Sequence, residues 1–283
     1  MVAGAACSKG TPHPTTIAIT PGAGPLDLRA GHARGVLLLH GFGDTPQTLS
    51  YLARYLHDRG FDVRVPLLPG HGRDISSFDT TSHEAWFDAA RSELFAMRAR
   101  YEWSGLCGLS MGGALAVLLA AQVRDLPSLV LLAPYLGMPL HARVAAATHR
   151  LWSDRVGPFR ARSSQSILDP EERAASLAYG VVTGRALQEL RTVVAKARSA
   201  LSQVNAPTLI IQSMKDNRIP PRVARRSLAA LGTTSKRLVF TRGAGHILTV
   251  DYGRERVFAE VQSWLERGPG TATPASEPGR VPT

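Results

Sequence analysis

The sequence predicts an α/β fold, in which a mostly parallel sheet is covered by helices on both faces. Short continuous apolar runs, typical of strands buried on both sides, alternate with segments of helical periodicity. The pentapeptide Gly108–Gly112 then fits the G-x-S-x-G turn that joins a strand to a helix. With 283 residues and 44% hydrophobic content, the chain suits one large domain of this class or two small ones.

The elements follow from the position of apolar runs between glycines, prolines and capping residues. Ser82 is a predicted helix cap, with Glu84 in the first turn. The predicted strands cover residues 35–40, 61–66, 105–107, 128–133, 207–213 and 236–240. The predicted helices cover residues 46–59, 82–100, 114–121 and 254–266.

Residues 137–205 break the alternation, with helical segments such as 170–178 and 186–201 but no clear strand. A structureless loop of that length is rare inside a compact domain. We therefore expect a small helical cap over the carboxyl ends of the strands, where open parallel sheets bind ligands. The remaining boundaries predict a flexible segment at 1–15, a domain at 16–267 and a disordered tail at 268–283.

Ser110 is the candidate nucleophile. It follows the apolar residues 105–107 and precedes 114–121, which are apolar on every face, as expected for a helix at the centre of a domain. Glycines two residues before and after the serine leave room for a strained turn. The alternative interpretation is a glycine turn with an incidental serine.

A serine hydroxyl needs a base and a third group that orients the base. In this type of turn the chain order is serine, acid, histidine. Asp216 and His246 each follow a predicted strand, so both are expected beside Ser110. Asp125 lies at the far end of a predicted helix, and Asp251 is expected to open the last helix. Neither of these acids competes strongly with Asp216.

Two backbone N–H groups are expected to form an oxyanion hole. One belongs to Met111, directly after the nucleophile, and the other to Phe42, in the glycine-rich turn that follows the first buried strand. His40 is expected to hold that turn rather than to act as the base. The turn at 69–72 (Pro-Gly-His-Gly) is interpreted as structural, with lining of the pocket as the alternative.

The net charge of +11 is carried almost wholly by arginine, since only four of the 33 basic residues are lysines. No compact basic run with interleaved aromatic residues predicts a nucleic-acid groove. A basic face would favour peripheral contact with an anionic membrane, or acidic substrates. The sequence predicts no oligomeric state.

Location is predicted from the cysteines and from hydropathy. Cys7 and Cys107 are the only cysteines, and a bridge between a terminal segment and a core strand is not expected. No apolar run approaches the roughly 18 residues needed to cross a bilayer. We expect a cytoplasmic protein. The alternative is an envelope lipoprotein attached through Cys7, if the true start lies upstream of Met1.

Together these residues resemble the α/β-hydrolase superfamily, and more narrowly its bacterial monoacylglycerol lipases and carboxylesterases. The resemblance covers roughly residues 26–266 and rests on five motifs: Leu37–Phe42, Pro69–Gly72, Gly108–Gly113, Ala206–Thr208 and Gly245–Asp251. It implies the triad and oxyanion residues given above, a small mobile cap, and no cofactor or metal. It also implies an ester or monoglyceride as the small-molecule substrate.

One segment departs from the family pattern. Asn217 and Arg218 stand where the family commonly has small or acidic residues, so Arg218 and His246 are both candidate partners of Asp216. The predicted insertion also carries nine arginines between Arg143 and Arg198.

The predicted function is hydrolysis of short- to medium-chain carboxylic esters, monoacylglycerols among them, through an acyl-enzyme. An acyltransferase, a thioesterase or an aminopeptidase would use the same triad. An aminopeptidase would present acids to the substrate amine, and the insertion offers Glu171, Glu172 and Glu189. A non-catalytic receptor on the same fold is the third hypothesis.

Overall fold

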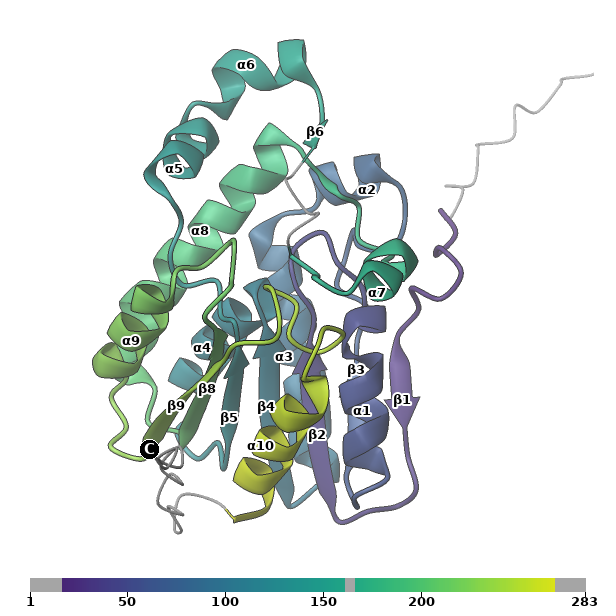
Figure 1. Cartoon of the computed structure of the whole chain (residues 1–283), viewed down its shortest axis with the longest axis vertical. Helices are drawn as coiled ribbons and strands as arrows, with labels where there is room; N and C mark the ends of the chain where they lie inside the picture. The colour runs from purple at the N-terminus through teal and green to yellow at the C-terminus, as the bar shows by residue number, and fades with distance from the viewer. Residues whose placement is uncertain (1–16, 161–165, 268–283) are drawn as a thin grey trace, which may run out of the picture.

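The computed structural model describes residues 17–160 and 166–267 (Figure 1). The predictions for segments 1–15 and 268–283 lie outside these residues. A seven-stranded sheet forms the centre, in the order β1-β3-β2-β4-β5-β8-β9, and only β1 is antiparallel to its neighbour. Its strands are β1 (Leu26–Leu28), β2 (Arg34–Leu39), β3 (Asp62–Val65), β4 (Trp103–Leu109), β5 (Leu129–Leu132), β8 (Thr208–Ser213) and β9 (Lys236–Thr241).

Helices cover both faces of this sheet and extend beyond one of its ends (Figure 1). Those of the body are η1 (Pro46–Leu49), α1 (Ser50–His57), α2 (Ile75–Thr80), α3 (His83–Arg100), α4 (Met111–Gln122), α9 (Pro221–Ala230) and α10 (Arg254–Arg267). Those of the region after β5 are α5 (Leu140–Ala147), α6 (His149–Val156), α7 (Pro170–Ala175), α8 (Gly184–Ala200) and η2 (Leu201–Gln203).

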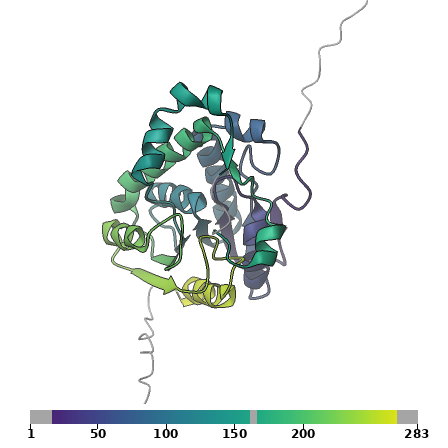
Figure 2. The same ribbon diagram turned by 45° about the horizontal axis from the view of Figure 1, so that its top comes forward.

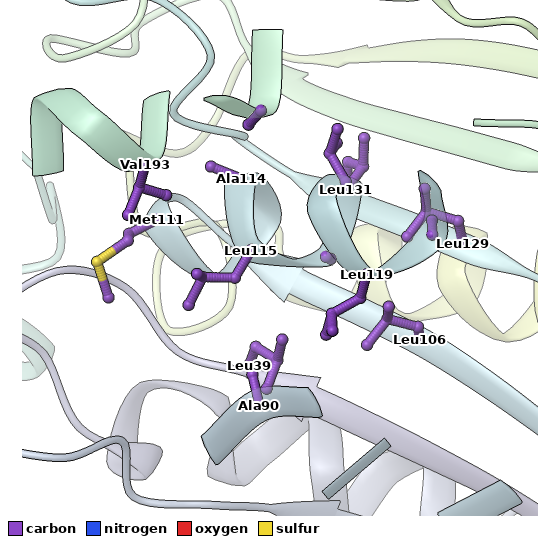
Figure 3. Packing of buried hydrophobic residues seen from close by; sticks show 14 of the residues in the cluster. Leu39, Ala90, Leu106, Met111, Ala114, Leu115, Leu119, Leu129, Leu131 and Val193 are labelled. Atoms are coloured by element: carbon purple, nitrogen blue, oxygen red, sulfur yellow. The ribbon is translucent and has the colours of Figure 1, made fainter. Parts of the chain in front are cut away.

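Alternation along the strands divides the apolar side chains between two cores. Val36 and Leu38 of β2 pack in the core formed with α1 and α10. Leu37 and Leu39 pack in the core formed with α3, α4 and α8. Figure 3 shows the α4 side of the second core, where α4 lies between the strands and α8. Continuous apolar strands are therefore what a sheet covered on both faces requires.

The observed sheet confirms the predicted α/β class, and the predicted strands and helices are all present. Ser82 caps α3, since its side chain accepts a hydrogen bond from the Ala85 N–H. Three body elements were not predicted: β1, α2 and α9. In α9 only Ala224 and Ser227 are buried, so its apolar stripe is too short to stand out.

In its described residues the region after β5 contains four α-helices and the short η2, as its helical sequence pattern suggested, but also a short hairpin. The strands β6 (Phe159–Arg160) and β7 (Val181–Val182) pair antiparallel, which corrects the expectation that this region has no strand. Two-residue strands are too short to show a period of two. The helices α5, α6 and α7 and the hairpin lie beyond the carboxyl ends of the parallel strands, whereas α8 runs from there over α4 (Figure 1 and Figure 2).

Within the described residues, no helix combines the length and the apolar character needed to span a bilayer.

Candidate active site

Ser110 lies between β4 and α4 in a backbone conformation that side chains rarely adopt, with φ 55° and ψ −115°. The two glycines of the motif permit this turn. A Cβ on Gly108 would lie 2.2 Å from the Gly112 carbonyl oxygen, and one on Gly112 would lie 2.1 Å from the Leu39 carbonyl oxygen. Leu39 ends β2. Gly108 therefore allows the two sides of the turn to approach each other, and Gly112 allows the turn to pack against β2.

The structure brings the three predicted triad side chains into one hydrogen-bonded chain. The Ser110 Oγ lies 2.8 Å from His246 Nε2, and His246 Nδ1 lies 2.8 Å from Asp216 Oδ2. An ionised carboxylate can only accept, so the proton belongs on Nδ1, and Nε2 is free to accept the serine proton. The side chains of His246 and Asp216 are almost wholly buried.

Four donors saturate the Asp216 carboxylate. Besides His246, they are the Gln212 amide and the backbone N–H groups of Arg218 and Ile219. Burial would raise the pKa of Asp216, but the His246 charge and these hydrogen bonds hold it below its ordinary value. Among the described residues, Asp216 therefore pairs with His246 alone, and Arg218 contributes its backbone rather than its guanidinium.

The predicted oxyanion residues lie on either side of Ser110. Met111 is the first residue of α4, a position whose N–H has no acceptor within its own helix. The turn after β2 approaches closely, since a Cβ on Gly41 would lie 3.4 Å from Ser110 Cβ. Phe42 follows in that turn and lines the cavity with Ser110. Both residues are thus close neighbours of the serine.

His40 holds this turn through both ring nitrogens. Its Nδ1 lies 3.0 Å from the Gly41 carbonyl oxygen, and its Nε2 lies 3.0 Å from the Leu68 N–H. Burial lowers the pKa of His40 well below its ordinary value, so the ring is neutral, with Nδ1 as donor and Nε2 as acceptor. The Gly41 carbonyl and the Phe42 N–H belong to one peptide plane and point in opposite directions. Anchoring the carbonyl therefore fixes the direction of the Phe42 N–H.

The Pro69–Gly72 turn packs behind His40, and none of its residues lines the cavity. The His71 ring meets the His40 ring edge-on, with 4.9 Å between ring centroids. Gly70 and Gly72 have φ values of +75° and +62°, which glycine tolerates. These contacts favour the structural interpretation of the turn.

A cavity of about 260 Å³ opens at Ser110 and is lined mainly by apolar atoms. Ser110 and the loops after β2, β8 and β9 form part of its wall, and the region after β5 forms the rest. The residues from that region are Tyr135, Ser166, Ile167, Arg173, Ser176, Ala178, Gly180, Val181, Val182, Leu187 and Leu190. A larger open depression of about 1060 Å³ lies between α2, α6 and α8, and none of the triad residues lines it.

Several residues that organise the site were not predicted. Asp251 does not cap α10, which begins at Arg254. Its buried carboxylate instead accepts from the N–H groups of Leu168, Asp169, Gly245 and Tyr252. It therefore joins the segment of residues 166–182, here called the cap return, to the loop that carries His246. The Gly-His-x-x-Thr-x-Asp pattern was the available signal, because it keeps an aspartate at a fixed distance from the histidine.

Tyr179 makes a second connection between the cap and the body. Its N–H donates to the Gly43 carbonyl, and its hydroxyl donates to the Gly70 carbonyl. Nearby, the Gln47 side chain donates to the Ala175 carbonyl and accepts from the Leu177 N–H. No local pattern signals contacts between residues this far apart in the chain.

Two groups of histidine and acidic side chains in the described part of the chain are close enough to hold a metal: His32–His57–Asp62 and His83–Glu84–Glu189. Both already have protein partners. Asp62 accepts from Tyr101, and His83 lies 2.9 Å from the Lys196 ammonium group. Neither group lines the cavity at Ser110.

A parallel sheet that carries a serine on a strained turn, within reach of a histidine and an aspartate on later loops, defines an α/β-hydrolase. Residues 31–252 match the family described as serine aminopeptidase, S33. This match spans well over half of the chain, so the protein belongs to that family.

Individual relatives agree. A thermostable monoacylglycerol lipase of Bacillus sp. (strain H-257) is 27% identical over 226 residues, which is 79% of this chain and 86% of that protein. A carboxylesterase of Bacillus subtilis (strain 168) is 27% identical over 247 residues, covering 86% and 96%.

A solved structure from a study of LipS and LipT, two metagenome-derived lipolytic enzymes, superposes with a TM-score of 0.80 at 27% identity. It covers 88% of this chain and 99% of that chain. These similarities confirm the α/β-hydrolase fold and the resemblance to monoacylglycerol lipases and carboxylesterases. They support an enzyme of the esterase and lipase kind.

Proposed function

We propose that this protein is a serine hydrolase that cleaves carboxylic esters of short- to medium-chain acyl groups, monoacylglycerols among them, through an acyl-enzyme. The observation that carries the proposal is the chain of 2.8 Å hydrogen bonds from Ser110 through His246 to Asp216, at the wall of a mainly apolar cavity. The chemistry needs no group beyond these side chains and two backbone amides.

In the first half-reaction, Ser110 Oγ attacks the ester carbonyl while His246 Nε2 takes the hydroxyl proton. Asp216 holds the tautomer that leaves Nε2 free, and it stabilises the imidazolium that forms. The negative charge on the carbonyl oxygen falls between the Phe42 and Met111 N–H groups. Collapse of this intermediate transfers the proton from Nε2 to the leaving alcohol and leaves an acyl-enzyme.

In the second half-reaction, water takes the place of the alcohol. His246 Nε2 removes a proton from the water, and the hydroxide equivalent attacks the acyl carbonyl. The same two N–H groups hold the developing oxyanion. Return of the proton to Ser110 Oγ releases the carboxylic acid and restores the free enzyme.

The size of the cavity supports the proposed chain length. A volume of about 260 Å³ suits a short or medium acyl chain, and Ile167, Val182, Leu187 and Leu190 provide apolar lining. The names of the two Bacillus relatives agree with this class of substrate.

The test is a chain-length series of 1-monoacylglycerols and p-nitrophenyl esters, from two to sixteen carbons. We expect kcat/KM to peak at short to medium chains and to fall for long ones. A Leu190→Phe variant, which narrows the cavity, should move the optimum to shorter chains. Absence of ester turnover, together with absence of labelling by a fluorophosphonate probe, would overturn the proposal.

The rival activities use the same triad and differ in the substrate. Glu172 pairs with Arg254 and Glu189 pairs with His83, so neither is offered to a substrate amine. Among the described residues that line the cavity, Asp44 is the single acid. An aminopeptidase would cleave aminoacyl p-nitroanilides faster than esters. Product analysis with added alcohol would detect an acyltransferase, and acyl thioesters would detect a thioesterase.

We further propose a cytoplasmic enzyme that contacts anionic membrane surfaces through its cap. The outer helices α5 and α6 expose large aliphatic side chains, with Leu140 and Leu151 each 72% exposed. Arg143 and Arg150 are exposed on the same two helices. Sedimentation with phosphatidylglycerol vesicles, compared with phosphatidylcholine vesicles, tests the contact. A Leu140→Ser, Leu151→Ser double variant should bind the anionic vesicles more weakly.

A further inference from the structure

Arg218 places a charged group in the wall of the catalytic cavity. It is partly buried, and burial lowers the pKa of its guanidinium from the ordinary value, which marks a site that resists an uncompensated charge. Within the described residues, its only side-chain hydrogen bond runs from Nε to the Ser166 hydroxyl, at 3.0 Å.

The two terminal nitrogens of Arg218 have no protein partner within the described residues, and neither is sealed from solvent. No carboxylate in the described part of the chain forms an ion pair with Arg218. The nearest acid in sequence is Asp216, and its four acceptor positions are filled. The terminal nitrogens of Arg218 are therefore available to a ligand of the cavity that this side chain lines.

Tyr135 supplies a further donor beside Arg218. Its ring lines the same cavity, and burial raises the pKa of its hydroxyl while the charge of Arg218 partly offsets that rise. Its backbone N–H donates to the Ser110 carbonyl, which ties it to the nucleophile turn. Tyr135 is thus fixed at the nucleophile turn and lines the same cavity as Arg218.

The charge of the cavity lining decides what kind of ligand it favours. Two arginines, Arg173 and Arg218, face one acid, Asp44. The Asp44 carboxyl is already bound to the Thr45 N–H and the Thr48 hydroxyl. The Arg218 guanidinium therefore meets no compensating acid in the described lining, and a single carboxylate would balance its charge.

We propose that the ester substrate carries a second, ionised carboxylate, which is bound by the terminal nitrogens of Arg218 and the hydroxyl of Tyr135. This inference rests on the proposed ester hydrolysis and narrows its substrate class to acidic esters. A planar guanidinium accepts a carboxylate through two parallel hydrogen bonds, so the group fixes orientation as well as charge. The apolar lining would then hold the carbon chain between the carboxylate and the scissile ester.

The test compares esters of equal length with and without the charge. On the acyl side, the pair is monomethyl adipate and methyl hexanoate. On the alcohol side, the pair is carboxymethyl butyrate and ethyl butyrate. We expect the wild-type enzyme to prefer the acidic ester of at least one pair, and the pair that shows the preference identifies which side of the ester faces Arg218.

Variants of Arg218 test whether this residue causes the preference for the acidic ester. In Arg218→Gln the ratio of kcat/KM for the acidic ester to that for the neutral ester should fall about 10- to 100-fold, the size expected for a hydrogen bond to a charged group. Arg218→Lys should keep part of the preference. Arg222→Gln is the matched control, because Arg222 is exposed on α9 and does not line the cavity. It should leave the ratio unchanged.

Binding separates this inference from the proposed hydrolysis. Calorimetry on the Ser110→Ala variant should show tighter binding of monomethyl adipate or carboxymethyl butyrate than of the matching neutral ester, and Arg218→Gln in that background should abolish the difference. Selective binding without turnover by the wild type would keep the anion site and remove the esterase. Turnover without preference in either pair, or a preference that Arg218→Gln retains, would overturn the anion site.

Discussion

The catalytic edge of the sheet and the outer part of the cap are built in opposite ways. At the sheet edge, Ser110, Asp216 and His246 each follow a parallel strand, and their side chains are nearly inaccessible to water. In the outer cap, Leu140 and Leu151 are 72% exposed on the short helices α5 and α6. The catalytic side chains thus stand at the ends of the sheet strands, and the cap contributes about half of the residues that line the cavity.

The cap return (residues 166–182) is intermediate between these two regions. Asp251 and Tyr179 bind it to the body through backbone groups. This segment therefore couples the cap side of the cavity wall to the loop of His246 and to the turn after β2. If this comparison holds, changes at the sheet edge should unfold the whole protein, and changes at the cap return should loosen only the cap.

The largest effect is expected from Gly112→Ala. The new Cβ would meet the Leu39 carbonyl at 2.1 Å, and a contact between two backbone segments cannot be relieved by a side-chain rotation. We expect the free energy of unfolding to fall by about 3 kcal/mol or more. Gly24→Ala is the control, because its Cβ meets nothing within 4 Å. Urea unfolding measures the stability of both variants. An equal loss of unfolding free energy in the two would contradict a tightly packed turn at Ser110.

Asp44→Asn should change how stability depends on pH. Burial raises the pKa of Asp44 to about 6 in the folded state, from an ordinary value of 3.8. The folded protein therefore holds this proton longer than the unfolded chain, and stability is lost as pH rises from about 4 to 6. The loss is at most about 3 kcal/mol.

The amide introduced by Asp44→Asn could donate to the Thr48 hydroxyl and still accept from the Thr45 N–H, so the variant should escape this loss. The free energy of unfolding, measured at pH 4 and pH 7, should rise in the variant relative to the wild type at the higher pH. A difference between the two proteins that stays constant with pH would show that Asp44 titrates normally.

Asp251→Asn should loosen the cap return. An amide offers one acceptor atom in place of two, so two of the four buried N–H groups would lose their partner. The expected cost is about 2–3 kcal/mol. Hydrogen exchange should accelerate at residues 166–182 and leave β4 protected. Uniform acceleration over both regions would mean that the cap return and the sheet unfold as one unit.

The smallest effect is expected at the ion pair between Glu172 of α7 and Arg254 of α10, at 2.6 Å. Both side chains are partly exposed, at 17% and 27%, so Glu172→Gln should cost less than about 1 kcal/mol. The cost should shrink further in 1 M salt. Thermal unfolding at low and high salt measures it, and a large salt-independent loss would assign a structural role to this pair.

The difference between the sheet edge and the cap also explains which features the sequence could predict. The strands preceding Ser110, Asp216 and His246 each contain a short apolar run, so their approximate ends, and the residues that follow, could be located from local pattern alone. The β6–β7 hairpin escaped prediction because two residues carry no period. Tyr179 and Asp251 act through partners about 80 to 135 residues away in the chain. Pairings of that kind depend on how the cap folds back, which no local pattern encodes.

Hydrolysis of p-nitrophenyl butyrate by the wild-type protein and by Ser110→Ala tests whether ester cleavage passes through Ser110. If Ser110, His246 and Asp216 act as one unit, the variant should retain the wild-type unfolding midpoint and lose roughly 10⁴- to 10⁶-fold in kcat. A variant that keeps the wild-type rate would show that ester cleavage does not pass through Ser110, and would contradict the account.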